Sequence, residues 1–135
     1  MLQWIKPPSI SKGEKVLGHW GERVAAWELR RRGFKILYRN YRAPHGGEID
    51  LICRDQETLV FVEVKTRRCE ELFRPLDAVN RAKRKLIQRG ALSWLRLLGR
   101  PDLTFRFDVV EVIATAPPEV RLIENAFVLP EPFQY

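Results

Sequence analysis

The sequence predicts an α/β protein in which a mixed central β-sheet is flanked by helices. Apolar residues recur at helical spacing over residues 13–32 and again over 76–98. Between these segments, residues 48–54 and 58–67 alternate apolar and polar side chains, as paired strands do. A further β-rich run follows at 105–113. Helices that alternate with strands in this order are expected to pack against one shared sheet.

The first helix is predicted over residues 13–32, and Gly33 ends it. Its expected buried stripe consists of Val16, Trp20, Val24 and Trp27. Residues 34–38 then form a short predicted strand, and residues 40–47 a polar turn region that contains several breakers.

The clearest local feature is a β-hairpin, because the segments 48–54 and 58–67 are separated only by the polar group Asp55-Gln56-Glu57. Residues 76–98 follow as one long helix or as two shorter ones interrupted near Gly90. After the strand at 105–113, residues 120–128 are predicted as a last edge strand.

Length and composition indicate one domain. The chain has 135 residues, of which 45% are apolar, enough for one core without disulfides or a structural metal. We expect a lead over 1–12, a domain over 13–128 and a tail over 129–135. The two cysteines form no C-x-x-C motif, and no apolar run has the length of a signal peptide or membrane span, so we expect a cytoplasmic protein with no membrane partner.

The chain is strongly basic, with a formal charge of +7 and a pI near 9.8. Such proteins gain affinity for polyanions through phosphate contacts, so nucleic acid is the leading candidate partner. The alternative is that the excess cations only keep the surface soluble, and charge alone favours neither explanation.

Carboxylates in the predicted hairpin suggest a metal site. Asp50 and Glu63 share a face only if the numbers of two residues that lie opposite each other in the hairpin add up to an odd number. A two- or four-residue loop centred between Asp55 and Gln56 meets this condition. Glu48 would then oppose Glu63, with Asp50 diagonal to it at roughly 7–8 Å. A three-residue loop would separate them. Like charges on one face require a cation, for which Lys65 would be a partial substitute in the metal-free state.

Phosphodiester cleavage uses such an arrangement, because a metal ion offsets charge on the phosphate and activates water. Lys65 could stabilise the developing negative charge or orient the attacking water. The alternative is that Glu63 and Lys65 mark only the solvated face of an amphipathic hairpin. Against this, Asp50 interrupts an otherwise apolar strand.

Glu22 is a further candidate, since it lies nearly opposite the aromatic stripe of the first helix, among small residues that permit a close approach. Its alternative role is an exposed glutamate paired with an arginine. Asp108 also interrupts an apolar strand, and we favour a structural role in which it holds Arg106 or a helix lysine.

Basic residues that follow the hairpin carboxylates are the best candidates for contacts with phosphates. Any one of them could equally belong to a solvated helix face. The candidates are Arg67, Arg68, Arg81, Lys83, Arg84 and Lys85.

Several segments, in order along residues 13–128, resemble the YraN-like bacterial proteins. They include 18–22, 47–52, 59–67, 106–110 and 123–127. That family is grouped with the PD-(D/E)xK nucleases and is similar to archaeal Holliday junction resolvases. The resemblance implies a restriction-endonuclease-like core, dependence on Mg²⁺ or Mn²⁺, branched or structured DNA as substrate, and often a homodimer.

The motif of this superfamily matches Asp50, Glu63 and Lys65, and its helix glutamate matches Glu22; Ile49 replaces the proline. The expected metal ligands are therefore Asp50, Glu63, Glu22, Glu48 and the Val64 carbonyl. A competing hypothesis is a basic nucleic-acid-binding module with a vestigial acidic cluster. Another is a protein-interaction domain that uses the Trp20 and Trp27 stripe or the face over 92–98.

Overall fold

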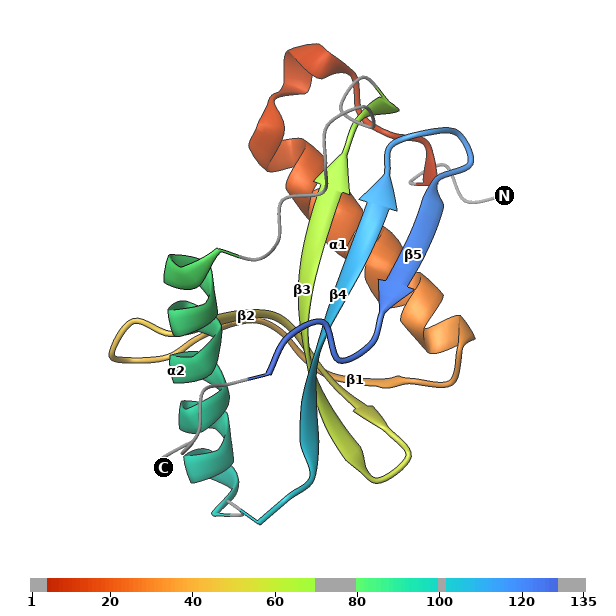
Figure 1. Cartoon of the computed structure of the whole chain (residues 1–135). Coiled ribbons are helices and arrows are strands. Elements are labelled where there is room, and N and C mark those ends of the chain that lie inside the picture. Colours follow the sequence, from red (N-terminus) through yellow and green to blue (C-terminus); the bar gives the residue numbers. More distant parts are fainter. Residues whose placement is uncertain (1–4, 70–79, 100–101, 129–135) are drawn as a thin grey trace.

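The computed structural model describes residues 5–69, 80–99 and 102–128 (Figure 1). Its centre is a five-stranded sheet in the order β1-β2-β3-β4-β5, in which only β3 and β4 are parallel. This confirms the predicted mixed sheet of an α/β protein and is consistent with a restriction-endonuclease-like core. The elements are α1 (Glu14–Arg31), β1 (Lys35–Arg42), β2 (Glu48–Asp55), β3 (Thr58–Arg67), α2 (Arg81–Leu98), β4 (Phe105–Ile113) and β5 (Glu119–Ile123).

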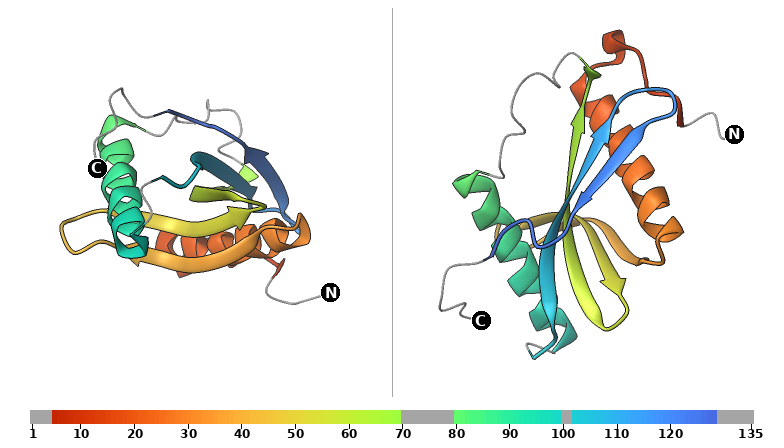
Figure 2. Two further views of the ribbon diagram at one scale, coloured as in Figure 1. Left: turned by 90° about the horizontal axis from the view of Figure 1, so that it is seen from below. Right: turned by 45° about the vertical axis from the view of Figure 1, so that its right-hand side comes forward.

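The two helices lie against opposite faces of the sheet, as Figure 2 shows. Alternate residues of β3 separate the two cores: Val60 and Val62 pack with α1, whereas Leu59 and Phe61 pack with α2. On the α2 side, Phe107 stacks on Phe127, with ring centroids 5.0 Å apart. Each helix is therefore held by its own apolar cluster.

The buried face of α1 differs from the predicted stripe. Trp20 and Val24 are buried, but Val16 and Trp27 are 44% and 42% exposed. The side that faces the sheet is rich in small residues instead, including Gly21, Ala25 and Ala26. The prediction was right for Trp20 and Val24 and wrong for Val16 and Trp27, because the small residues turn their own side of α1 toward the sheet.

Three further elements can be compared with the prediction: β1, α2 and the last strand. Residues 40–42 belong to β1 rather than to a turn, and Asn40 adopts a positive φ of 53° there. Helix α2 continues through Gly90 without interruption, although its predicted start at 76–79 lies outside the described residues. The last strand covers Glu119–Ile123 and ends before a turn at Asn125, where φ is 49°. No helix among the described segments is long and apolar enough to cross a membrane.

Close packing at Gly21 brings α1 against the end of β3. A Cβ atom at position 21 would overlap the hydroxyl oxygen of Thr66 and lie 2.9 Å from Thr66 Cβ. Rotation of the threonine side chain does not move its Cβ, so the clash requires a backbone shift. At Gly18, one turn earlier in the same helix, an added Cβ meets nothing within 4 Å.

We therefore predict opposite effects for two alanine substitutions in α1. Gly21→Ala should lower the free energy of unfolding by about 1–3 kcal/mol through overpacking. Gly18→Ala should raise it by roughly 0.5–1 kcal/mol, since alanine favours helix more than glycine does. Chemical denaturation of both variants measures this, and equal effects would contradict the close contact.

Candidate metal centre

The candidate site lies where β2 and β3 part. Their paired residues run from Asp55 opposite Thr58 to Leu51 opposite Val62, across the two-residue turn Gln56-Glu57. Beyond this point the strands diverge (Figure 1), and the Asp50 carboxylate takes over the hydrogen bonding. Its Oδ2 accepts the Val64 N–H at 2.8 Å. A side chain thus bridges the two strands where their backbone pairing ends.

In the observed register the numbers of paired β2 and β3 residues have an odd sum, as is required for Asp50 and Glu63 to share a face. The register is shifted by one position from the predicted centre, so its continuation places Asp50, and not Glu48, opposite Glu63. Asp50 and Glu63 are consequently brought together directly. This corrects the expected pairing of Glu48 with Glu63, because the turn lies one residue later than the polar group suggested.

Glu63 is the most buried acid of this group, with 6% of its surface exposed. Its Oε2 is buried and finds no hydrogen-bond donor among the described residues. Burial, and then the neighbouring Asp50 charge, raise the pKa of Glu63, and burial likewise raises the pKa of Asp50. The two carboxyls therefore share a proton or require a cation.

Glu22 approaches from α1, on the other side of the sheet. It lines a cavity of about 220 Å³ together with Asp50, Glu48 and Asn40. Burial, and then the Asp50 charge, raise the pKa of Glu22, which shows that the two acids are close enough to repel. Asn40 of β1 lies opposite Asp50 of β2 when the observed register is continued. A hydrogen bond from the Asn40 side chain to Glu22 lowers the pKa of Glu22 and so counteracts the rise.

The same cavity is also lined by basic residue types from α1 and β1. Lys15 and His19 come from one turn of the helix, and Arg42 comes from the strand. Arg42 also bonds Glu48 at 3.2 Å. Acidic and basic side chains therefore line one and the same cavity.

Lys83 is the lysine that directly contacts the acids of this cluster. Lys83 Nζ lies 2.6 Å from Glu48 Oε1 and 3.6 Å from Glu63 Oε1. The hydrogen bond from Lys83 lowers the pKa of Glu48 despite its partial burial. Lys65 is half-buried and near enough to Glu63 to favour its charged form, but forms no ion pair with a described residue. Lys65 thus favours the charged form of Glu63 through space, whereas Lys83 makes the direct contacts with the acids.

The acids do not form a closed ligand cage. Among the residues that the structure describes, no three His, Cys, Asp or Glu side chains converge as they do in an assembled metal site. Only Asp50 and Glu63 meet, with Glu22 and Glu48 outside them. Mg²⁺ commonly binds to proteins through one or two carboxylates and keeps several waters. This donor set therefore fits a Mg²⁺ ion that keeps part of its water shell better than an ion that is bound by protein ligands alone.

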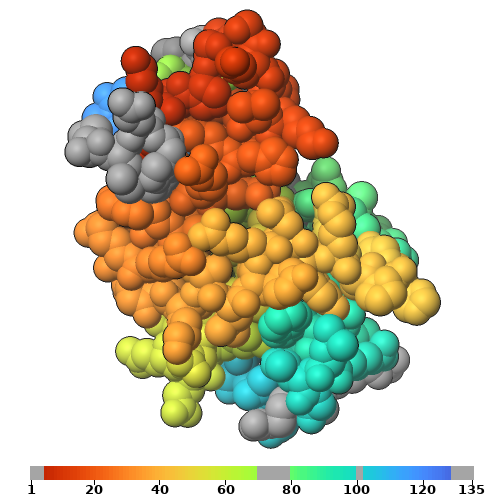
Figure 3. Space-filling view, turned by 180° about the vertical axis from the view of Figure 1, so that it is seen from behind, coloured from red at the N-terminus to blue at the C-terminus, as the bar shows by residue number. Residues whose placement is uncertain are grey.

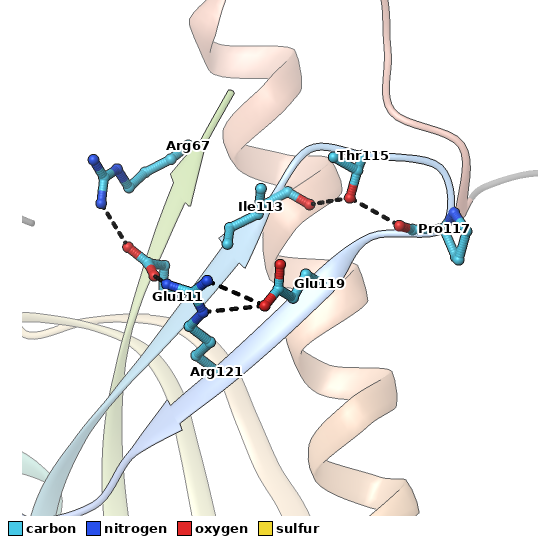
Figure 4. A network of polar contacts seen from close by, with 7 residues as sticks. All are labelled: Arg67, Glu111, Ile113, Thr115, Pro117, Glu119 and Arg121. Carbon is cyan, nitrogen blue, oxygen red and sulfur yellow. Dashed lines mark hydrogen bonds and ion pairs between the residues drawn. The ribbon is translucent and has the colours of Figure 1, made fainter. Parts of the chain in front are cut away.

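The six basic residues predicted to contact phosphates have different surroundings. Arg67 donates to Glu111 Oε2 at 2.9 Å within a network that continues to Arg121 (Figure 4). Arg68 donates to the Pro8 carbonyl at 3.3 Å, and Lys83 faces the carboxylates. The remaining three, Arg81, Arg84 and Lys85, are exposed on α2.

A larger groove lies beside the site, between the β1–β2 connection and α2, on the face that Figure 3 shows. Its volume is about 420 Å³. Ala43, Pro44 and Leu92 form part of its wall, and Arg89 and Arg96 supply positive charge. This groove contains none of the acids, so it is a surface next to the candidate centre and not part of it.

Comparisons with known proteins place the chain in a family. Residues 21–112 match the model of "Uncharacterised protein family UPF0102". A UPF0102 protein of Geobacter sulfurreducens is 44% identical over 121 residues, which cover 88% of this chain and 94% of that protein. One from Chlorobaculum tepidum is 46% identical over 98 residues, covering 73% and 75%. The chain belongs to the UPF0102 family.

In this UPF0102 protein, Asp108 has the structural role that was favoured from sequence. It is 1% exposed, and its carboxylate accepts Arg106 Nε at 3.0 Å and the Asn125 N–H at 3.0 Å. Arg106 also reaches Asp55 at 3.1 Å. Asp108 therefore ties β4 to the segment after β5, and through Arg106 to the hairpin end.

Sequence reasoning missed two features of the UPF0102 site, the position of Lys83 and the contribution of Asn40. A signal for Lys83 was present, since the first turn of α2 contains no acid but three cations, against the preference of the helix dipole. For Asn40 the signal was weaker: asparagine tolerates the left-handed conformation that its positive φ requires.

We predict that Asp108→Ala destabilises the fold without affecting the candidate centre. Loss of one partner from a buried ion pair costs roughly 3 kcal/mol, since Arg106 keeps its charge in a desolvated position. Thermal unfolding should show this loss, while Mn²⁺ affinity at a temperature where the variant stays folded should match that of the wild type. A large change in affinity would mean that Asp108 belongs to the site.

Proposed function

We propose that this protein is a metal-dependent endonuclease-like enzyme that hydrolyses phosphodiester bonds in DNA, with branched or structured DNA as the preferred substrate. The observation that carries the proposal is the Asp50–Glu63 pair. The buried Glu63 and the half-buried Asp50 are held together at the parting of β2 and β3, and Glu63 Oε2 is left without a donor among the described residues. Two ionised carboxylates in this position repel each other, and a bound cation would relieve that repulsion.

Asp50, Glu63 and the Val64 carbonyl would hold Mg²⁺ or Mn²⁺. Glu22 and Glu48, which lie outside the Asp50–Glu63 pair, would complete the set of ligands. When bound, the ion supplies Lewis acidity to the scissile phosphate and lowers the pKa of a coordinated water. The bond from the Val64 N–H to Asp50 Oδ2 orients that carboxylate before any ligand arrives.

Lys65 is the residue proposed to act on the phosphate. It follows Glu63 by two positions on β3, so both side chains start from the same face of the strand. Its ammonium forms no ion pair with a described residue, which leaves it available to neutralise charge on a phosphate oxygen or to orient the attacking water. Asp50, Glu63 and Lys65 together match the motif of the PD-(D/E)xK nucleases.

Substrate binding is proposed to use the cations around the centre. The chain carries a formal charge of +7, and exposed Arg81, Arg84 and Lys85 follow the site along α2. The groove that contains Arg89 and Arg96 extends this basic surface along the same helix. Phosphate contacts of this kind bind nucleic acid with a strong dependence on salt.

A non-catalytic nucleic-acid-binding module remains the second candidate. The observation in its favour is the Lys83–Glu48 contact of 2.6 Å, since an internal lysine that satisfies the acids permanently would make a metal unnecessary. The two candidates share the basic surface and differ in whether Asp50 and Glu63 support turnover.

The cleavage assay compares the wild type with Asp50→Asn, Glu63→Gln and Lys65→Ala, on four-way-junction and linear DNA with Mg²⁺. We expect each substitution to reduce the rate roughly 100-fold or more, because each removes a group that contacts the ion or the phosphate. Glu57→Gln, in the exposed hairpin turn, is the charge-matched control and should cleave normally. A wild type that binds DNA but never cleaves it would establish the second candidate.

DNA affinity should depend on the basic surface and not on the acids. Arg89→Gln combined with Arg96→Gln should weaken binding and flatten the slope of log affinity against log salt concentration by roughly 2, one for each lost phosphate contact. Asp50→Asn should leave this slope unchanged. Fluorescence anisotropy in Ca²⁺ or EDTA measures both, and an unchanged slope in the double variant would remove the groove from the DNA-binding surface.

A further inference from the structure

We propose that Lys83 is a resident counter-cation of the carboxylate centre, and that a divalent ion must displace its ammonium from Glu63 in order to bind. The inference rests on the proposed function, since it assumes that Asp50 and Glu63 are metal ligands. It adds a residue outside the Asp50, Glu63 and Lys65 motif, and gives it a positioning role.

The contacts of Lys83 support this role. Its Nζ bonds Glu48 Oε1 at 2.6 Å and approaches Glu63 Oε1 to 3.6 Å, so one ammonium bridges acids from β2 and β3. The bond to Glu48 is the shorter one. The longer approach to Glu63 can therefore be given up while the lysine stays attached to Glu48.

The position of Lys83 is fixed by the start of α2. Asn80 caps the helix, and its side-chain oxygen accepts the Lys83 backbone N–H at 2.8 Å. A cation in the first turn is disfavoured by the helix dipole. Burial also disfavours the ammonium, yet the bond to Glu48 and the charges of Glu63 and Asp50 raise the pKa of Lys83. The acids, and not the helix, account for a lysine at this position.

Helix α2 is held against β2 by a glycine contact two turns after Lys83. A Cβ at Gly47 would overlap the backbone nitrogen of Gly90, and a Cβ at Gly90 would lie 2.8 Å from Ile49 Cγ1. Residues 83 and 90 lie on the same side of the helix, since seven residues complete nearly two turns. The backbone of Lys83 therefore stays close to the centre, and only its flexible side chain needs to move.

The charges explain why displacement would occur. Lys83 brings one positive charge to a group of four acids, Glu22, Glu48, Asp50 and Glu63. A divalent ion brings two charges and binds oxygen ligands directly, so it compensates the Asp50–Glu63 pair better than the lysine does. The released ammonium remains beside the centre, where it can meet a substrate phosphate.

The test measures Mn²⁺ binding calorimetrically in Lys83→Met and in Lys85→Met, which removes the same charge from an exposed position of the same helix. We expect Lys83→Met to bind Mn²⁺ on the order of tenfold more tightly than Lys85→Met, because a competing charge within a few ångströms is gone. In EDTA, Lys83→Met should unfold at a lower temperature than Lys85→Met, and Mn²⁺ should remove most of this difference. A lysine with only a structural role would lower the unfolding temperature equally with and without Mn²⁺.

Three results separate the two hypotheses. If Asp50→Asn abolishes Mn²⁺ binding but Lys83→Met and Lys85→Met bind equally, the displacement of Lys83 is refuted and the metal site stands. If Asp50→Asn binds Mn²⁺ as the wild type does, or if no chain binds it, the metal site and the displacement are both refuted. Should Lys83→Met not fold, Lys83→Gln replaces it, with tighter Mn²⁺ binding than Lys85→Gln as the expected result.

Discussion

The arrangement of the centre depends on the end of the β2–β3 ladder. Past Leu51 and Val62 the strands no longer exchange backbone hydrogen bonds, and the Asp50 carboxylate accepts the Val64 N–H in their place. This bond fixes Asp50 beside Glu63 at the point where the two interior strands part. If the ladder continued, the two acids would lie on a closed sheet and no helix residue could reach them from the α1 side.

Glycine contacts determine how near the helices come. Gly21 allows α1 to pack directly on Thr66, which brings the neighbouring Glu22 toward Asp50. Gly47 and Gly90 allow α2 to approach β2, which brings Lys83 to Glu48. A glutamate and a lysine from opposite faces of the sheet thus meet at one opening. The balance between acids and cations there is set by packing distances as much as by the residues themselves.

Much of the fold was predictable because its signals are local. The hairpin, the strand at 105–113 and the two amphipathic helices follow from periodicity over short segments, and the structure confirms them. The prediction failed where long-range packing outweighed local preference: at the face of α1, which small residues turn toward the sheet, and at Asn40–Arg42, where pairing with β2 extends a strand through a turn-like sequence. The predicted centre of the hairpin turn was wrong by one residue, because Asp55, Gln56 and Glu57 are all polar and the sequence does not show which two of them form the turn.

By itself, the sequence determined that acids and a lysine alternate along two strands of one hairpin, and that an odd register would bring Asp50 and Glu63 to one face. Only the tertiary structure decided which cation neutralises them. Lys83 lies 35 residues from Glu48 in the chain, and the two meet because α2 docks on β2 through a pair of glycines. Periodicity reports which face of an element is apolar, but the partner of a charged side chain depends on how separate elements pack, and that information is not local.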